Sequence, residues 1–327
     1  MIKTDVDFFN PDKICDSGQI FRMYRAEGEA SVFLVHSGDR RLKITRTGKE
    51  VFFHCSDEDY ESYWRHFLDM DRNYEALAAM TDPKDDFLRK ACLEGKGLRI
   101  LNQDLFETII SFIVSQQKQI PSIRKCVESL CERFGTLHKE DAVVPYPCRT
   151  TGPQSGEENV KGSLTDSSWY GFPKPESIAT AGPDGLKGLS LGYRERYIYE
   201  TSCMYARVEK ELRAAVEKKD FTEVRRILLS MTGIGEKVAD CILLFACGDL
   251  DSFPVDTHII SIMEREYPAT DNKKTVSAEY EQKKMTPAQA RERVREIFGK
   301  YKGFSGLVQQ WIFAYEIRKP DSVKPEE

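Results

Sequence analysis

The stretch that decides the fold is Phe221–His258, FTEVRRILLSMTGIGEKVADCILLFACGDLDSFPVDTH. Asp220 and Glu223 form a helix-capping pair that predicts where a first amphipathic helix begins. Gly233 and Gly235 then permit a tight turn before a second apolar helix, because glycine tolerates backbone angles that other residues avoid. The stretch therefore predicts a helix-hairpin-helix.

The hairpin turn has a chemical consequence. The backbone N–H groups in the first turn of its second helix lack partners and lie at the positive end of the helix dipole. A phosphate group can accept hydrogen bonds from them. Such a turn grips a DNA backbone without reading the bases.

Lys237 and Asp256 are the candidate chemical groups of this stretch. The helix dipole and the apolar helix face around Lys237 are expected to lower the pKa of its ammonium, which makes it a nucleophile for a sugar carbon and a Schiff-base former. Asp256 begins the helix that follows a loop containing Gly248 and Pro254, and its carboxylate suits a cationic sugar transition state. The plain alternatives are a solvated Lys237 and an Asp256 that only caps a helix.

Composition limits the class of protein. The 327 residues include 48 Lys plus Arg and 53 Asp plus Glu, for a net charge of −5. The hydrophobic fraction of 40% and the charged fraction of 31% exclude wholesale disorder. The sequence contains neither a run of about 18 apolar residues nor a secretory leader pattern, so we expect a cytoplasmic protein without membrane contact. Because acidic residues outnumber basic ones, DNA binding must rely on a local basic surface or on a local phosphate-binding turn.

Side-chain metal binding is not indicated. The nine cysteines contain no C-x-x-C pair, and the five histidines show no H-x-x-x-H spacing. We therefore expect no organic cofactor and no metal held by side chains.

The N-terminal region has the pattern of an antiparallel sheet. Between Ile20 and Phe53, short runs rich in Val, Phe, Ile and Thr are separated by glycines that predict turns, at Gly28, Gly38 and Gly48. From Asp59 the periodicity is helical almost to the end. The predicted fold is α+β and mostly α, with an N-terminal antiparallel sheet domain packed on two helical subdomains.

The predicted domains are residues 1–100, the sheet with its following helices, and 101–327, the helical part. Residues 144–168 are rich in Pro, Gly, Ser and Thr and are expected to form a flexible insertion. Asp104 and Glu107 form a capping-box pattern that opens an apolar central helix.

Seven segments resemble, in the same order, the 8-oxoguanine DNA glycosylase/lyase family of the helix-hairpin-helix, Gly/Pro, Asp superfamily. They span most of the chain and are SGQIFRM (17–23), SFIVSQQ (111–117), YGFP (170–173), LGYRERY (191–197), GEKVADCILL (235–244), PVDTH (254–258) and QQWIFAYEIR (309–318). The resemblance implies that Lys237 attacks the anomeric carbon of a flipped nucleotide, expels the oxidised base and cleaves the strand by β-elimination, with Asp256 as its partner.

The resemblance also assigns the base pocket. It implies that the carbonyl of Gly18 accepts the N7 hydrogen that 8-oxoguanine has and guanine lacks. Phe313 matches the aromatic that stacks on the flipped base, Cys241 the thiol on its other face, and Gln309 the amide on its Watson–Crick edge. Each residue also has a purely structural alternative. Gly18 could simply form a turn, Phe313 and Cys241 could belong to the core, and Gln309 could be a solvated side chain.

The DNA contacts are assigned in the same way. His258 matches a histidine that contacts phosphate, Tyr193 and Arg194 match a pair that wedges between bases, and Gln117 is placed to fill the vacated space. Gly233 and Gly235 belong to the DNA-binding hairpin. The resemblance allows a structural cation on hairpin backbone carbonyls near Met231 and Ile234. The implied partner is double-stranded DNA containing oxidised guanine, bound by a monomer that associates with the nucleoid.

One position departs from the family pattern. Ser122 stands where the family commonly has an Arg that reads the cytosine opposite the lesion. A serine lacks the paired guanidinium donors, so we expect a relaxed preference for the opposite base.

Three other functions stay open at this point. One is a monofunctional glycosylase for alkylated bases, against which Lys237 argues. The second is a non-enzymatic helix-hairpin-helix module, and the third is an unrelated Schiff-base lyase. The endonuclease III branch is excluded, because its four-cysteine iron–sulfur loop has no counterpart after Cys247.

Overall fold

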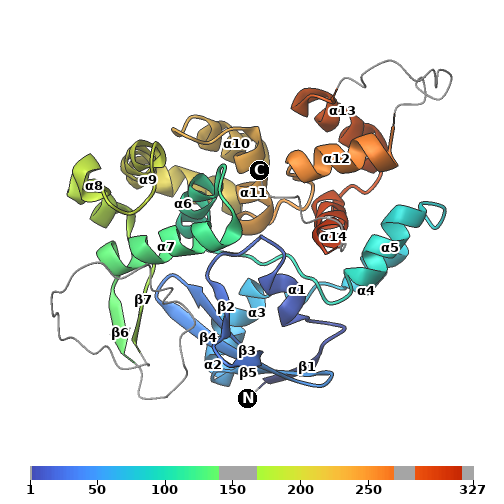
Figure 1. Cartoon of the computed structure of the whole chain (residues 1–327), viewed down its shortest axis with the longest axis horizontal. Coiled ribbons are helices and arrows are strands. Elements are labelled where there is room, and N and C mark those ends of the chain that lie inside the picture. The colour runs from blue at the N-terminus through green and yellow to red at the C-terminus, as the bar shows by residue number, and fades with distance from the viewer. Residues whose placement is uncertain (1, 140–167, 269–283, 319–327) are drawn as a thin grey trace.

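The fold consists of a five-stranded antiparallel sheet covered by helices (Figure 1). The computed structural model describes residues 2–139, 168–268 and 284–318. The predicted insertion at 144–168 lies almost entirely outside these residues. The strands are β1 (Ile2–Asp5), β2 (Met23–Ala26), β3 (Glu29–Ser37), β4 (Arg40–Thr47) and β5 (Glu50–His54), in the order β1-β5-β4-β3-β2.

The predicted meander is confirmed. Gly28, Gly38 and Gly48 all have positive φ, at 76°, 56° and 61°, and connect β2 to β5 through tight turns. Ile44 on β4 is fully buried, whereas its neighbour Lys43 is half-buried, as expected for a sheet with one face on the core. Strand β1 was not predicted, and it adds an edge beside β5.

Short helices accompany the sheet. Helix α1 (Pro11–Cys15) lies between β1 and β2, and after β5 come α2 (Asp57–Asp59), the π-helix η1 (Tyr60–Trp64), α3 (Arg65–Phe67), α4 (Tyr74–Ala79) and α5 (Asp86–Glu94). Helix α5 packs against the last helix of the chain, so the first hundred residues also contribute to the helical part.

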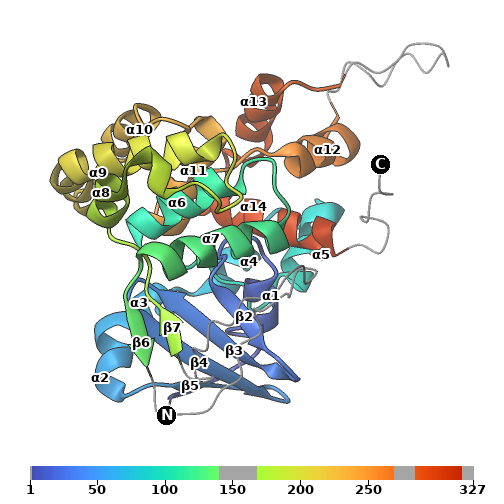
Figure 2. The same ribbon diagram turned by 60° about the vertical axis from the view of Figure 1, so that its left-hand side comes forward.

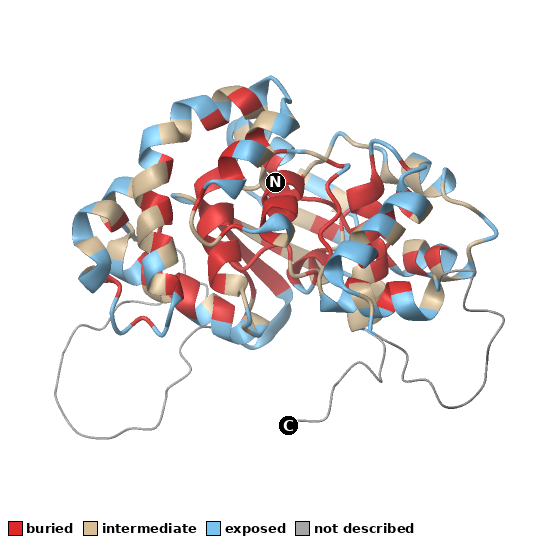
Figure 3. Ribbon diagram, turned by 90° about the horizontal axis from the view of Figure 1, so that it is seen from above, coloured by how far each residue is buried: buried red, intermediate tan, exposed pale blue. Residues whose placement is uncertain are grey.

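The remaining helices form two groups above the sheet (Figure 2). The first group contains α6 (Leu105–Ser115), α7 (Ile120–Phe134), α8 (Pro175–Gly185), α9 (Arg194–Glu217), α10 (Phe221–Leu229) and α11 (Glu236–Ala246). The second contains α12 (Thr257–Glu266), α13 (Pro287–Phe298) and α14 (Ser305–Ile317). Buried residues concentrate in the middle of the molecule, and exposed residues occupy the outer helices (Figure 3).

The expectation of purely helical structure after Asp59 is wrong in one place. Strands β6 (Leu137–Lys139) and β7 (Ser168–Tyr170) pair antiparallel. Each is only three residues long, so neither carries a recognisable alternation, and the partners are far apart in sequence.

The start of α6 is predicted correctly, but the capping box is not. Asp104 accepts a hydrogen bond from the backbone N–H of Glu107 at 2.9 Å. The carboxylate of Glu107 instead accepts from the N–H of Gly38 at 2.8 Å, in the β3–β4 turn. Glu107 therefore joins the central helix to the sheet.

Glu107 belongs to a buried charge cluster between sheet and helices. Arg22, directly before β2, is 1% exposed and donates to Glu128 on α7 at 3.0 Å and to the carbonyl of Tyr170 at 2.5 Å. Its Nη1 atom lies 3.9 Å from Glu107. Burial raises the pKa of Glu107 to about 7, although the Arg22 guanidinium and the Gly38 amide act in the opposite direction.

This cluster predicts a pH-dependent stability. A carboxyl whose folded pKa lies above its unfolded pKa of about 4.5 binds more protons in the native state, so its stabilising contribution is present at low pH and is lost as pH rises through about 7. We expect the wild-type free energy of unfolding to fall, relative to that of Glu107→Gln, by on the order of 1 to 3 kcal/mol between pH 5 and pH 8. Urea denaturation across this range measures the difference, and parallel pH profiles for the two proteins contradict it.

Candidate active site

The predicted hairpin is present between α10 and α11. Gly233 has φ +85°, and a Cβ atom there would lie 2.7 Å from the Tyr197 ring. Its carbonyl accepts a hydrogen bond from Nε2 of Gln116 at 2.7 Å, from the turn that follows α6. The hairpin therefore requires glycine at this position and is anchored to a second turn.

The beginning of α11 is open. Gly235 is the N-cap residue, no side chain caps the helix, and a Cβ atom there would meet no atom within 4 Å. Arg225 on α10 bridges Glu236 at 3.0 Å and Asp240 at 2.5 Å, which holds the two helices of the hairpin together. The uncapped first turn suits an anion such as a DNA phosphate.

Lys237 lies in the first turn of α11 and is half-buried. Its Nζ atom is 5.4 Å from the centre of the Phe112 ring on α6, and Cys241 lies one helical turn further along α11. The pKa of the Lys237 ammonium is raised, because the Cys241 sulfur in its ionised form and the carboxylates of Asp256 and Asp240 favour the positive charge more than burial disfavours it. The expectation of a lowered pKa is therefore wrong.

The difference has a local and a tertiary cause. Cys241, the largest contributor, lies one helical turn after Lys237 on α11, and the fold adds the carboxylate of Asp256. Burial raises the pKa of the Cys241 thiol to about 11, so this sulfur is protonated at neutral pH. At neutral pH the resting site thus contains an ammonium and a neutral thiol.

Asp256 has the predicted position at the start of α12. Its Oδ1 atom accepts a hydrogen bond from the N–H of Ile259 at 2.9 Å, so the capping role is confirmed. The side chain is half-buried and acts electrostatically on Lys237. Its role in chemistry stays a prediction.

The structure brings three of the proposed pocket and phosphate residues together. A Cβ atom on Gly18, which has φ +72°, would lie 3.7 Å from the Phe313 ring and 4.0 Å from Ile120 on α7. The His258 ring meets the Phe313 ring edge-on at 5.6 Å, and His258 is exposed. Residues from the N-terminal domain, α12 and α14 thus meet around Phe313.

Gln309 lies one helical turn before Phe313 on α14. It is 3% exposed, and its Oε1 atom accepts a hydrogen bond from Nε2 of Gln310 at 2.9 Å. A polar side chain buried this deeply is held in one orientation.

The elements assigned to the DNA gap also meet. Gln117 is exposed and has φ +50°, an uncommon conformation for a residue other than glycine. Tyr193, at the start of α9, is 48% exposed. Arg194 is buried, donates to the carbonyls of Leu191, at 3.1 Å, and of Gln116, and lies 4.4 Å from the Tyr193 ring.

Arg194 therefore differs from the expectation of a side chain presented to DNA. Its guanidinium is engaged in holding the Gln116–Gln117 turn against the start of α9. The sequence reasoning also missed Gln116, which anchors Gly233, and Phe112, which lies beside Lys237. Gln116 could have been identified in the sequence, because it is a polar residue directly after an apolar helix. Nothing in the sequence distinguishes Phe112 from an ordinary core residue.

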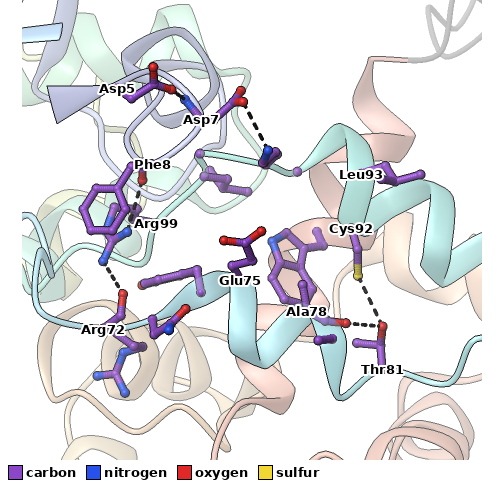
Figure 4. Close-up of a pocket in the computed structure, with 18 of the residues that line it drawn as sticks. Asp5, Asp7, Phe8, Arg72, Glu75, Ala78, Thr81, Cys92, Leu93 and Arg99 are labelled. Atoms are coloured by element: carbon purple, nitrogen blue, oxygen red, sulfur yellow. Dashed lines mark hydrogen bonds and ion pairs between the residues drawn. The ribbon is translucent and has the colours of Figure 1, made fainter. Parts of the chain in front are cut away.

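A cavity of about 800 Å³ lies elsewhere, between the N-terminal loop, α4, α5 and Trp311 (Figure 4). None of the proposed site residues lines it. In the part of the chain that the structure describes, no group of three or more His, Cys, Asp or Glu side chains is placed to hold a metal ion. No described helix has the length and apolar character that a membrane span requires.

Comparison with known proteins agrees with this geometry. Residues 1–109 match the 8-oxoguanine DNA glycosylase N-terminal domain, and residues 110–288 match the HhH-GPD superfamily of base excision DNA repair proteins. The chain belongs to this superfamily and, within it, to the 8-oxoguanine DNA glycosylase/lyase family.

Individual relatives are similar at modest identity. A Saccharomyces cerevisiae N-glycosylase/DNA lyase is 27% identical over 252 residues, covering 72% of this chain and 60% of the relative. The Arabidopsis thaliana N-glycosylase/DNA lyase OGG1 is 26% identical, covering 81% of this chain and 65% of the relative. The chain thus matches slightly less than two thirds of the length of these two proteins.

A solved structure is similar over nearly the whole chain. The Clostridium acetobutylicum 8-oxoguanine glycosylase/lyase, in complex with double-stranded DNA containing cytosine opposite 8-oxoguanine, has a TM-score of 0.75 and 26% identity. The match covers 94% of this chain and 91% of that one.

The two hairpin glycines make a matched pair for a stability test. We expect Gly233→Ala to destabilise the protein by at least about 1 to 2 kcal/mol, because the positive φ is strained for alanine and its Cβ clashes with Tyr197. Gly235→Ala is expected to cost less than about 1 kcal/mol, since its backbone is extended and its surroundings are open. Denaturant unfolding measures the free energy of unfolding of both variants. Equal losses of stability would contradict the requirement for glycine at position 233.

Proposed function

We propose that the protein flips 8-oxoguanine out of double-stranded DNA, excises the base and then cleaves the strand through a Schiff base. One observation carries the proposal. A lysine amine lies in a half-buried position beside the Phe112 ring, coupled to the carboxylate of Asp256, directly after an uncapped hairpin helix. An amine and a carboxylate beside a phosphate-binding turn suit attack on a sugar carbon.

The steps follow from these positions. The first-turn amides of α11 bind a DNA phosphate, and the extruded nucleotide presents its anomeric carbon to Lys237. The lysine is an ammonium at rest and must lose a proton before it attacks. We assign Asp256 the role of accepting this proton and of stabilising the positive charge that develops on the sugar, because its carboxylate acts electrostatically on the amine.

Departure of the base leaves the lysine bonded to the sugar carbon. Opening of the sugar ring gives a Schiff base, which acidifies the neighbouring carbon and permits β-elimination of the 3′ phosphate. The names of the related N-glycosylase/DNA lyases support this second step.

Recognition of the base is assigned to the residues around Phe313. The Gly18 carbonyl accepts the N7–H of 8-oxoguanine; guanine has no hydrogen there and leaves this acceptor unpaired, at a cost of about 1 to 3 kcal/mol. Phe313 stacks on the base, the neutral Cys241 thiol contacts its other face, and Gln309 contacts its Watson–Crick edge.

On the DNA side, Gln117 and Tyr193 are the exposed groups at the gap, and His258 contacts phosphate. We assign Arg194 the role of holding the turn that carries Gln117, through its hydrogen bond to the carbonyl of Gln116. The protein acts as a monomer in the cytoplasm and needs no organic cofactor; a cation on the hairpin carbonyls near Met231 and Ile234 remains compatible with the proposal. Similarity to the Clostridium complex supports DNA as the partner.

Trapping with borohydride tests the nucleophile. We expect the wild-type protein to form a covalent adduct with duplex DNA containing 8-oxoguanine, and Lys237→Gln to form none, because only a primary amine gives a reducible Schiff base. Adduct formation is measured on denaturing gels.

Asp256→Asn provides a separate control. Asparagine caps a helix as well as aspartate does, so this variant keeps its stability while excision falls by at least about 100-fold. An adduct in Lys237→Gln would contradict the proposed nucleophile. Base loss without an adduct in the wild type would favour a monofunctional glycosylase.

Ser122 predicts relaxed reading of the opposite base. It is exposed in the first turn of α7 and has no guanidinium. We expect wild-type excision of 8-oxoguanine to vary by less than about 100-fold among the four opposite bases, and Ser122→Arg to increase preference for cytosine by about 10-fold or more. Single-turnover rates on four duplexes measure this preference, with Ser122→Lys as the charge-matched control.

A further inference from the structure

The direction of the Gly18 carbonyl is fixed by the residue that follows it. A peptide bond is planar, so the C=O of Gly18 and the N–H of Gln19 lie in one rigid plane. That N–H donates to Oγ of Ser17 at 3.4 Å, and Ser17 in turn donates to the carbonyl of Ile14 at 2.7 Å. Any group that holds Gln19 therefore also sets where the Gly18 carbonyl points.

Hydrogen bonds hold Gln19 at both atoms of its side-chain amide and at its backbone carbonyl. Its side chain is fully buried, its Nε2 donates to the carbonyl of Arg99 at 2.8 Å, and its Oε1 accepts from the N–H of Leu101 at 2.9 Å. Its backbone carbonyl accepts from Nε2 of Gln103 at 2.7 Å. The side-chain amide thus pairs with the 99–101 backbone much as a neighbouring strand would.

The segment that receives Gln19 is itself rigid. The Arg99 guanidinium lies 4.2 Å from the centres of both the Phe8 and Tyr74 rings. It donates to the carbonyls of Phe8 at 3.1 Å, Asp69 at 3.0 Å and Arg72 at 2.8 Å, and Figure 4 shows Arg99 between Phe8 and Arg72. Gln19 is therefore fastened to a fixed backbone.

Gln103 extends this link to the lysine helix. Its backbone N–H donates to the carbonyl of Phe245 at 2.8 Å, in the last turn of α11. The same residue holds the carbonyl of Gln19 with its side chain. One glutamine thus connects the segment carrying Gly18 to the helix carrying Lys237.

We propose that Gln19 and Gln103 are positioning residues that determine specificity for 8-oxoguanine. They aim the Gly18 carbonyl at the base and hold it at a set distance from the lysine helix. Neither touches the DNA. The inference rests on the proposed function, since it concerns the carbonyl assigned to the N7–H.

The test separates recognition of the base from the chemistry of the lysine. Cleavage of a duplex that already contains an abasic site needs Lys237 but no base pocket. We expect Gln19→Met to lower kcat/KM for 8-oxoguanine excision by on the order of 10- to 100-fold, because a small misplacement of a binding group has effects of this size. Cleavage of the abasic duplex is expected to stay within about threefold of wild type, a change of less than one decade in rate.

Gln19→Glu adds a pH readout that a purely structural role does not produce. A protonated glutamate can still donate to the Arg99 carbonyl and accept from Leu101, whereas its ionised form repels that carbonyl. Burial favours the protonated form. The excision rate of this variant relative to wild type should therefore recover severalfold from pH 8 to pH 5.5, and Gln19→Met should show no such recovery.

Two further variants make the result decisive. Leu212→Ala removes a fully buried side chain near the far end of α9 and serves as a destabilised control. The proposal is overturned if Leu212→Ala loses 8-oxoguanine excision and abasic-site cleavage in the same ratio as Gln19→Met does. It is also overturned if Gln19→Met keeps its 8-oxoguanine excision. Should the Gln19 variants fail to fold, Gln103→Met, which removes only the side-chain bond to Gln19, is expected to show the same selective loss.

The wild-type protein distinguishes this inference from the proposed function. Wild-type protein that does not excise 8-oxoguanine overturns the proposed function. If the wild-type protein is active and the Gln19 and Gln103 variants lose 8-oxoguanine excision and abasic-site cleavage to the same extent, only the positioning role of the two glutamines is overturned.

Discussion

The packing around Phe112 is the contact on which the candidate site depends. This ring, on the central helix α6, meets Phe21 edge-on at 5.4 Å, stacks on Phe245 at 5.6 Å and lies 5.4 Å from the Lys237 amine. Phe21 belongs to the segment that begins with Gly18, and Phe245 belongs to the lysine helix. A single aromatic side chain therefore sets the spacing between the Gly18 segment proposed to recognise the base, the proposed nucleophile Lys237 and the core.

Polar contacts reinforce this apolar junction at the same level of the molecule. Arg22 and Glu107 join the sheet to α6 and α7, while Gln116 joins the end of α6 to the hairpin turn. The site is thus assembled at an interface among the sheet domain and the two helical groups. Each group contributes a residue that cannot act alone: a carbonyl, an amine or a carboxylate.

Much of this arrangement was predictable because its signals are local. Turn glycines, the caps Asp104 and Asp256 and the hairpin are each specified within a few residues. The failures arise where distant residues decide the outcome. Glu107 bonds to Gly38 instead of its own helix, and the carboxylate of Asp256 adds to the effect of Cys241 in raising the pKa of Lys237. Burial of Arg194 and the three hydrogen bonds that join Gln19 to Arg99, Leu101 and Gln103 also depend on chain segments that periodicity cannot bring together.

The turn that carries Gln117 has a thermodynamic consequence. Arg194 donates to the carbonyl of Gln116 in this turn, and the Gln116 side chain donates to the carbonyl of Gly233. Gln117 itself occupies a left-handed backbone conformation. The conformational entropy of shaping this tip is lost during folding, so it need not be lost again when DNA arrives. Most of the cost of opening the duplex then falls on the unstacking of the bases, which is smallest where a lesion has already weakened the pair. Within the proposed function, a stiff tip of this kind acts as a probe of local DNA stability before any base enters the pocket.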